Sequence, residues 1–94
     1  MAHEIRWTEE SEAHIARHGI EPAEVEEAAY TGPRLTASGR EGTRLVFGTT
    51  SAGRHLLVVL AQAQDGSDYC VTAREMTTQE RRSFRRRTTR GAGA

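Results

Sequence analysis

The segment His55-Leu56-Leu57-Val58-Val59-Leu60-Ala61-Gln62 decides the fold, because it is apolar at both odd and even positions. A half-buried strand alternates apolar and polar side chains, whereas a strand covered on both faces is apolar throughout. The segment therefore predicts a central strand with other parts of the chain packed on both sides. It is also far shorter than the roughly 20 consecutive apolar residues that span a bilayer, so no membrane partner is expected.

Further strands are expected on both sides of this central segment. Turn sequences separate them, among them Asp65-Gly66, which is typical of a tight hairpin, and residues 38–42. Four segments have the composition or the alternation of strands: residues 3–7, 34–37, 44–47 and 69–74. Together with the central strand they predict a small antiparallel sheet of about four to five strands.

Two helices are expected before the sheet's main run. Thr8 is a suitable N-cap, and the first helix should continue to about His18, where Gly19 can adopt the left-handed conformation that ends a helix. Pro22 is tolerated in the first turn of a second helix, which should end near Tyr30. Their apolar residues are mostly small, so packing rather than intrinsic helix stability must hold both helices in place.

One helix is expected after the sheet. Thr77 and Glu80 have the spacing of a capping box, which predicts a helix from there to about Arg87. Residues 88–94 are expected to form a disordered tail. The predicted fold is therefore α+β, with two N-terminal helices, a small antiparallel sheet and one C-terminal helix in a single domain over residues 1–87.

Length and composition limit the class of protein. The chain has 94 residues, which provide one hydrophobic core and no second one. Cys70 is the one cysteine, so an internal disulfide scaffold is excluded, and this residue is most simply a small buried or half-buried apolar side chain. The N-terminus lacks a basic and then apolar secretory pattern, so we expect a cytoplasmic protein.

A net charge of zero conceals a strong asymmetry along the chain. Residues 1–32 hold eight carboxylates and two arginines, whereas residues 74–94 hold seven arginines and two carboxylates. All the basic residues other than histidine are arginine, which binds phosphate through two parallel hydrogen bonds and stacks on bases. The asymmetry favours a localised surface for a polyanion. A GC-rich coding sequence also favours arginine, and that explanation stays open.

Several motifs together resemble the BrnT toxins, which belong to the wider RelE/ParE-like group. The resemblance extends from about residue 3 to residue 87. The matching residues are Trp7, His18-Gly19-Ile20, Glu24-Val25-Glu26-Glu27-Ala28, Arg44, Gly48, Gly53-Arg54-His55-Leu56-Leu57-Val58-Val59, Val71-Thr72-Ala73-Arg74-Glu75-Met76-Thr77 and Glu80-Arg81-Arg82-Ser83-Phe84.

This resemblance implies a RelE-like fold and the toxin of a type II toxin–antitoxin system. Such a toxin is an endoribonuclease that inhibits translation and is neutralised by a cognate, BrnA-like antitoxin, which also binds operator DNA. The implied partners are therefore that antitoxin and an RNA substrate, with a homodimer inside the toxin–antitoxin complex as a further option. The resemblance also places arginine at positions 44, 54 and 74.

RNA cleavage without a metal needs three functions, namely activation of the 2′-hydroxyl, stabilisation of the phosphorane charge and protonation of the leaving oxygen. Arg44, Arg54 and Arg74 come from different strand ends, and a compact sheet could bring them together to stabilise the charge. His18 and His55 are the candidate proton carriers. The alternative for each arginine is a solvated side chain or an ion pair with a carboxylate.

Strand alternation gives Arg74 an expected direction. If one set of side chains on the last strand faces the helices, the other faces an open groove. The set expected against the helices is Tyr69, Val71 and Ala73, and the set expected in the groove is Cys70, Thr72 and Arg74.

A metal site is not expected. His14 and His18 are four residues apart on one helix face, and Glu10 extends the row at the same spacing. Two histidines and a carboxylate on one helix rarely complete a tetrahedral zinc site. We therefore expect no metal and no other cofactor.

The C-terminal helix is the predicted RNA-binding element. Arginines spread over much of its surface around Phe84, and the four assigned to RNA are Arg81, Arg82, Arg85 and Arg86. They could track the phosphate backbone without reading sequence. The alternative is a solvated amphipathic helix.

Two hypotheses of different classes remain. The favoured one is an RNA-cleaving toxin that acts through arginine and a histidine or glutamate proton carrier. The other is a non-catalytic, toxin-like module that binds a protein partner or nucleic acid.

Overall fold

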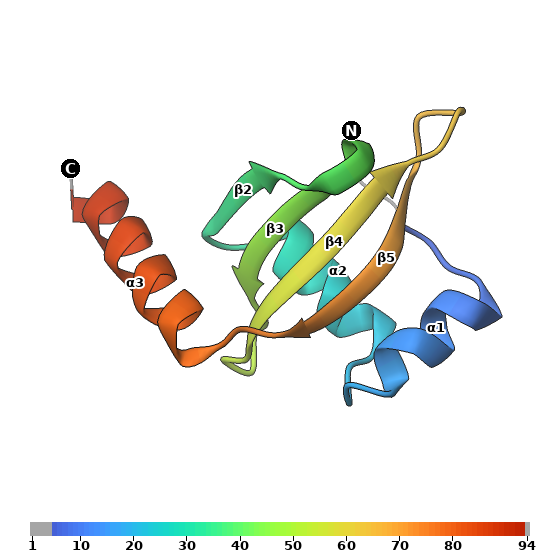
Figure 1. The fold of residues 1–94 in the computed structure, drawn as a ribbon. Helices are drawn as coiled ribbons and strands as arrows, with labels where there is room; N and C mark the ends of the chain where they lie inside the picture. Colours follow the sequence, from blue (N-terminus) through green and yellow to red (C-terminus); the bar gives the residue numbers. More distant parts are fainter. Residues whose placement is uncertain (1–4, 94) are drawn as a thin grey trace.

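The computed structural model describes residues 5–93, with side chains described as far as Thr88. Five strands and three α-helices in this range make an α+β fold, with a short 3₁₀ turn, η1, between two strands (Figure 1). The elements in chain order are β1 (Ile5–Arg6), α1 (Glu9–Ala16), α2 (Pro22–Tyr30), β2 (Arg34–Ser38), η1 (Arg40–Gly42), β3 (Arg44–Thr49), β4 (His55–Gln62), β5 (Asp68–Glu75) and α3 (Thr78–Gly93).

The sheet is mixed, and in this respect the expectation of an antiparallel sheet is wrong. The strand order is β1-β5-β4-β3-β2, and β2 to β5 pair in an antiparallel manner. β1 instead runs parallel to β5, through the pairs Ile5 with Asp68 and Arg6 with Tyr69. Parallel pairing requires a long connection between the two strands, and here the chain from α1 to β4 forms that connection. No local signal in the two residues of β1 specifies their distant partner.

The helix boundaries follow from local chemistry. Thr8 caps α1 as expected, and Ser11 completes a capping box with it. α1 ends at Ala16, two residues before the expected His18, and Gly19 follows with φ of 71°. Pro22 occupies the first turn of α2 as expected, because a proline there loses no helical hydrogen bond.

The capping box of α3 is confirmed. The Glu80 amide donates to Thr77 Oγ1 at 3.1 Å, and the Thr77 amide donates to the Glu80 carboxylate at 2.9 Å. α3 runs to Gly93, past the expected end near Arg87. We expected residues 88–94 to form a disordered tail. Ala94, the last residue of that segment, lies outside the described residues.

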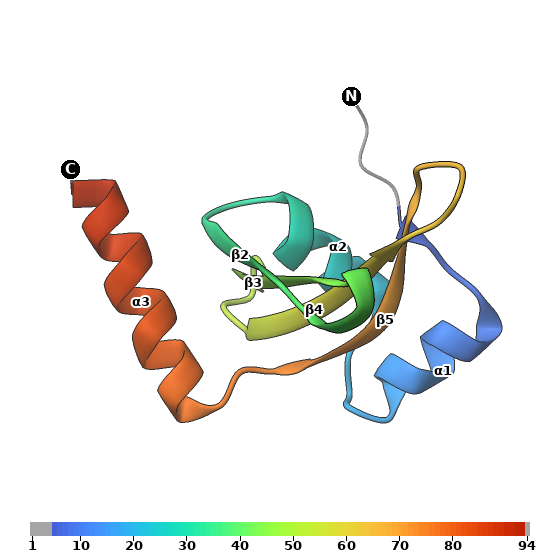
Figure 2. The same cartoon turned by 45° about the horizontal axis from the view of Figure 1, so that its top comes forward.

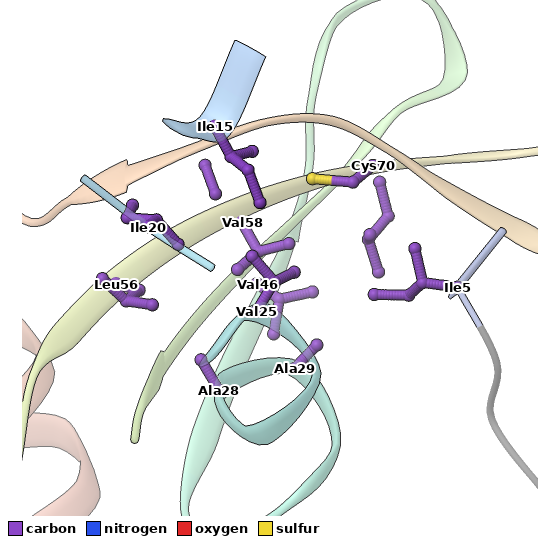
Figure 3. Close-up of a cluster of buried hydrophobic side chains, with 12 residues drawn as sticks. Ile5, Ile15, Ile20, Val25, Ala28, Ala29, Val46, Leu56, Val58 and Cys70 are labelled. Carbon is purple, nitrogen blue, oxygen red and sulfur yellow. The ribbon is translucent and has the colours of Figure 1, made fainter. Parts of the chain in front are cut away.

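The main core lies between one face of the sheet and helices α1 and α2 (Figure 3). β4 supplies Leu56, Val58 and Leu60, each at most 1% exposed. Burying each such side chain contributes about 1.5–3 kcal/mol. The rest of the cluster comprises Ile5, Ile15, Ile20, Val25, Ala28, Ala29, Val46, Cys70 and Ala73.

The opposite face of β4 is also covered, as the sequence predicts for this strand. Leu57 is buried there, and its register partner Phe47 lines a small cavity with Phe84 of α3. α3 stands on the β2 side of the sheet (Figures 1 and 2). Phe84 is the one buried side chain among residues 78–88, so it provides the main apolar anchor of α3.

A β-bulge changes the alternation on β5. Val59 pairs with Thr72 but Leu60 pairs with Cys70, so Val71 is an extra residue between them. The bulge turns Cys70 into the helix-side core, where it is 2% exposed, and leaves Val71 exposed. The expectation that Cys70 lies in the groove, and Tyr69 and Val71 against the helices, is therefore wrong, since Tyr69 is also exposed. Ala73 faces the helices as expected.

We predict that Gly48→Ala destabilises the fold. Gly48 is buried on β3, and a Cβ there would overlap the backbone carbonyl of Ala28 on α2. Moving α2 away from the sheet should lower the free energy of unfolding by roughly 2–3 kcal/mol. Urea titration followed by circular dichroism measures this loss. Thr36→Ala on the exposed edge strand β2 is the control and should change the value by less than about 0.5 kcal/mol. Equal midpoints for both variants would contradict the close packing of α2.

Candidate functional site

Arg44 begins β3 and is paired with Asp68, which begins β5. Arg44 Nη2 lies 3.2 Å from Asp68 Oδ2, and the Tyr30 hydroxyl donates to the same carboxylate oxygen at 3.0 Å. Burial and the hydrogen bond to Asp68 raise the pKa of Tyr30 well above its ordinary value. The Asp68 carboxylate thus joins β3, β5 and the end of α2, which is a structural role.

Arg54 lies between a tight turn and β4, and it makes the densest set of polar contacts among the described residues. Its Nη1 lies 2.9 Å from both oxygens of Glu24 and 3.0 Å from the Gly19 carbonyl. Its Nε and Nη2 donate to Glu75 at 3.2 and 3.0 Å. The pKa of Glu24 is lowered, first by a hydrogen bond from the Glu21 backbone and then by Arg54. Arg54 therefore clamps α2 and the α1–α2 turn to one end of the sheet.

Arg74, on β5, forms a fork-to-fork pair with Glu80 of α3. The two nitrogen–oxygen distances are 2.9 and 3.0 Å, and Arg74 also donates to the Glu75 carbonyl at 3.0 Å. The hydrogen bond from Arg74 is the main cause that lowers the pKa of Glu80. Because Glu80 also closes the capping box of α3, one carboxylate both starts this helix and ties it to the sheet.

The expected convergence of the three guanidinium groups in one cleft is wrong. Each has its own carboxylate partners within the described residues. Arg54 and Arg74 both contact Glu75, but Arg54 binds its carboxylate and Arg74 its backbone carbonyl. Alternation along β3 places Arg44 on the same face of the sheet as Val46, and Val46 belongs to the helix-side core. Arg74 is the register partner of Leu57 and lies on the α3 side. A guanidinium that is partly withdrawn from water is stabilised by a nearby carboxylate. The nearest carboxylates differ among the three arginines, so each arginine is held in a different place.

His18 does not join these arginines in an active-site arrangement. It lies in the exposed turn after α1, and its ring is 6.0 Å from that of His14 at an interplanar angle of 55°. Within residues 5–93, no group of three or more histidine, cysteine or carboxylate side chains could hold a metal ion.

His55 is the predicted proton carrier that the fold places beside α3. It is the first residue of β4, half-buried, and its ring meets Phe84 edge-on at 5.8 Å. The pKa of His55 is lowered, first by burial and then by the positive charges of Arg85 and Arg81. An imidazole in this setting is neutral at pH 7 and can accept a proton.

The four arginines assigned to RNA all lie exposed on α3, and two of them, Arg81 and Arg85, act on the pKa of His55. Arg81, Arg82, Arg85 and Arg86 form no ion pair in the described part of the chain. Their positive charges are therefore available to a ligand, in contrast to those of Arg44, Arg54 and Arg74. We call His55 with Arg81 and Arg85 the His55 site.

The His55 site can supply two of the functions that RNA cleavage requires. A neutral imidazole can take the proton of a 2′-hydroxyl, and two guanidinium groups can stabilise the charge on a phosphorane. Sequence reasoning identified these residues separately but did not identify Phe84 and Glu80 as the groups that hold α3 beside His55. The capping-box position of Glu80 was the available signal, because it fixed where α3 begins.

The comparisons with known proteins add no family assignment. Neither the protein-family models, nor the curated proteins, nor the solved structures contain a match to this chain. None of the helices described between residues 5 and 93 has the length and apolar character needed to cross a bilayer.

We predict that the arginines of the His55 site control its titration. In Arg81→Gln/Arg85→Gln, the pKa of His55 should rise but stay below 6.5, because burial remains. A pH titration of the imidazole protons, followed by nuclear magnetic resonance, measures the pKa of His55. Arg82→Gln/Arg86→Gln removes the same charge from the same helix and should leave the titration nearly unchanged. A wild-type value at or above 6.5 would contradict the geometry.

We predict that Arg54 stabilises the fold rather than acting in catalysis. Arg54→Gln should lower the free energy of unfolding by about 1–2 kcal/mol at pH 7, measured with urea, whereas Arg40→Gln in an exposed turn should have little effect. Because the pKa of Glu24 is lowered in the folded chain, its stabilisation is lost as pH falls below 4.5. That acid loss should be smaller in Arg54→Gln. Unchanged stability of this variant would argue against the clamp.

Proposed function

We propose that this chain is a metal-independent endoribonuclease that acts at the His55 site. The observation that carries the proposal is the position of His55, half-buried against Phe84 and beside the exposed Arg81 and Arg85. This arrangement joins a proton acceptor to positive charges that have no carboxylate partner among the described residues. It replaces the cluster of three sheet arginines as the centre of the reaction.

The proposed chemistry is an attack of the 2′-hydroxyl on the adjacent phosphate. His55 takes the hydroxyl proton as the new phosphorus–oxygen bond forms, and Arg81 and Arg85 stabilise the charge on the phosphorane. The 5′-oxygen leaves as its bond to phosphorus breaks, and protonated His55 or water returns the proton. Arg82 and Arg86 continue the positive surface and would hold the neighbouring phosphates.

The biological part of the proposal rests on the resemblance to BrnT toxins of the RelE/ParE-like group. On that basis the chain is the toxin of a type II toxin–antitoxin pair in the cytoplasm, with RNA as its substrate and a BrnA-like antitoxin as its partner. A homodimer within that complex belongs to the same proposal. The matched motifs that support it include His18-Gly19-Ile20 and the run from Val71 to Thr77.

A second candidate function is nucleic-acid binding without cleavage. The engagement of Arg44, Arg54 and Arg74 in ion pairs favours it, because those arginines are then not free to bind a phosphorane. Under this hypothesis α3 still binds RNA, but His55 serves only to pack Phe84.

We predict that His55→Gln separates the two functions. Purified protein is incubated with radiolabelled RNA in EDTA, and cleavage is measured on denaturing gels. His55→Gln should cleave at least about 100-fold more slowly than wild type while binding RNA equally well, since glutamine cannot accept the proton. Arg81→Gln/Arg85→Gln should lose both cleavage and affinity, and its salt slope should fall by about 1 for each charge removed.

The matched control is His14→Gln, a half-buried histidine on α1 that lies outside the His55 site. It should cleave RNA at the wild-type rate. Wild-type protein that binds RNA in a salt-sensitive manner but leaves it intact would support the non-catalytic function instead. Cleavage that survives in His55→Gln would show that the proton carrier lies elsewhere.

A further inference from the structure

A broad hollow beside α1 is not used by the His55 site. It has a volume of about 720 Å³ and lies between α1, η1 and the ends of β4 and β5. α1 packs along β5 and forms one wall of the hollow (Figure 1). The turn after α1 is held at the end of β5, because Arg54 contacts both Gly19 and Glu75. A ligand therefore meets side chains in this hollow and does not join the sheet.

Two exposed apolar side chains line the hollow. Tyr69 and Val71 are each 43% exposed, and they are the two large apolar side chains that are exposed among the described residues. The β-bulge on β5 turns Val71 outward. Exposed apolar side chains grouped in a concave surface mark a site for a partner.

The hollow combines an exposed aromatic ring with carboxylates. Glu10 and Glu41 line it beside Tyr69, whereas Arg17 is the one arginine in the lining. Neither Glu10 nor Glu41 forms an ion pair in the described part of the chain. A guanidinium can pair with a carboxylate and stack on a tyrosine ring, and the apolar stem of arginine can cover Val71. These side chains therefore suit an arginine-rich segment, and the carboxylates repel phosphate.

The chain itself carries an arginine-rich segment in α3. Arg82 and Arg86 are four positions apart, so they lie on one side of this helix, opposite the buried Phe84. Both arginines are exposed, and neither has a carboxylate partner among residues 5–88. They point away from the sheet and lie outside the His55 site.

The hollow and α3 of one chain lie at opposite edges of the sheet. Phe84 and the Arg74–Glu80 pair fix α3, which stands on the β2 side, whereas the hollow lies beside β5 (Figures 1 and 2). An α3 that enters the hollow therefore belongs to a second copy. The charge asymmetry supports this occupant, because residues 1–32 are acidic and residues 74–94 are basic, which makes two copies complementary.

We propose that copies of this chain associate, with α3 of one copy seated in the hollow of another. Arg82 and Arg86 pair there with Glu10 and Glu41, and one of the two guanidinium groups stacks on Tyr69. Because these arginines also continue the positive surface assigned to RNA, association and RNA binding compete for them. The contact does not depend on RNA cleavage at the His55 site, and either can fail without the other.

Sedimentation velocity of the purified full-length protein at low salt tests the association. The sedimentation coefficient should rise with protein concentration. Raising sodium chloride to about 0.5 M should weaken the association at least about tenfold, since salt screens exposed charges. Wild-type protein that stays monomeric up to about 1 mM would overturn the proposal.

The role of the hollow is tested with a matched pair of variants. Glu10→Gln/Glu41→Gln should weaken association roughly fivefold, whereas Glu9→Gln/Glu12→Gln changes the net charge equally and should leave association nearly unchanged. All four residues are exposed, so both variants should fold, which circular dichroism checks. Equal losses in the two variants would overturn the specific role of the hollow.

Charge reversal tests both surfaces at once. Glu10→Arg/Glu41→Arg and Arg82→Glu/Arg86→Glu should each fail to associate alone, because like charges then face each other. A mixture of the two keeps one wild-type contact, with α3 of the first variant in the hollow of the second. This mixture should form a one-to-one complex, and a mixture that stays monomeric would overturn the proposal.

Two further outcomes would assign the hollow to another occupant. An oligouridylate that shifts the amide resonances of Tyr69 and Val71 in ¹⁵N-labelled protein would make it an RNA site. Wild-type protein that stays monomeric, but whose Tyr69 and Val71 amides shift with an oligoarginine peptide, would assign it to a basic segment of another protein. Either result would overturn a second copy as the occupant.

Discussion

The pairing of Arg44, Arg54 and Arg74 with carboxylates is the constraint that organises this molecule. The side chains of Arg54 and Arg74 are 27% and 39% exposed, so each guanidinium has lost part of its hydration. Ion pairs compensate for this loss, with Glu24 and Glu75 for Arg54 and with Glu80 for Arg74. These pairs connect α2 and α3 to the sheet. They also neutralise the charges of these three arginines. The largest group of arginines without an ion pair among the described residues lies on α3, which is why function is proposed there.

The central strand links this arrangement to the core. β4 buries Leu56, Val58 and Leu60 against α1 and α2 on one face and Leu57 on the other. Its first residue, His55, consequently lies at the end of a rigid strand, where Phe84 of α3 covers it. Two attachments, the apolar contact of Phe84 and the Arg74–Glu80 pair, fix α3 beside this imidazole.

Much of the fold could be predicted because its signals are local. The apolar run over residues 55–62 coincides with β4, and the caps at Thr8 and Thr77 are where the sequence places them. What could not be predicted depends on distant partners. β1 joins β5 across most of the chain, and the bulge at Val71 appears only when the β4–β5 register is known. The arginines failed to converge for the same reason, since Glu24 is thirty positions from Arg54.

The central claim is that the paired arginines hold the fold and the unpaired arginines of α3 bind the ligand. The most direct measurement observes the arginine Nε–Hε resonances while an oligouridylate is added to ¹⁵N-labelled protein. The account predicts shifts for Arg81 and Arg85, together with the His55 ring, and unchanged resonances for Arg44 and Arg54. Shifts centred on Arg44 and Arg54, with α3 unaffected, would contradict it.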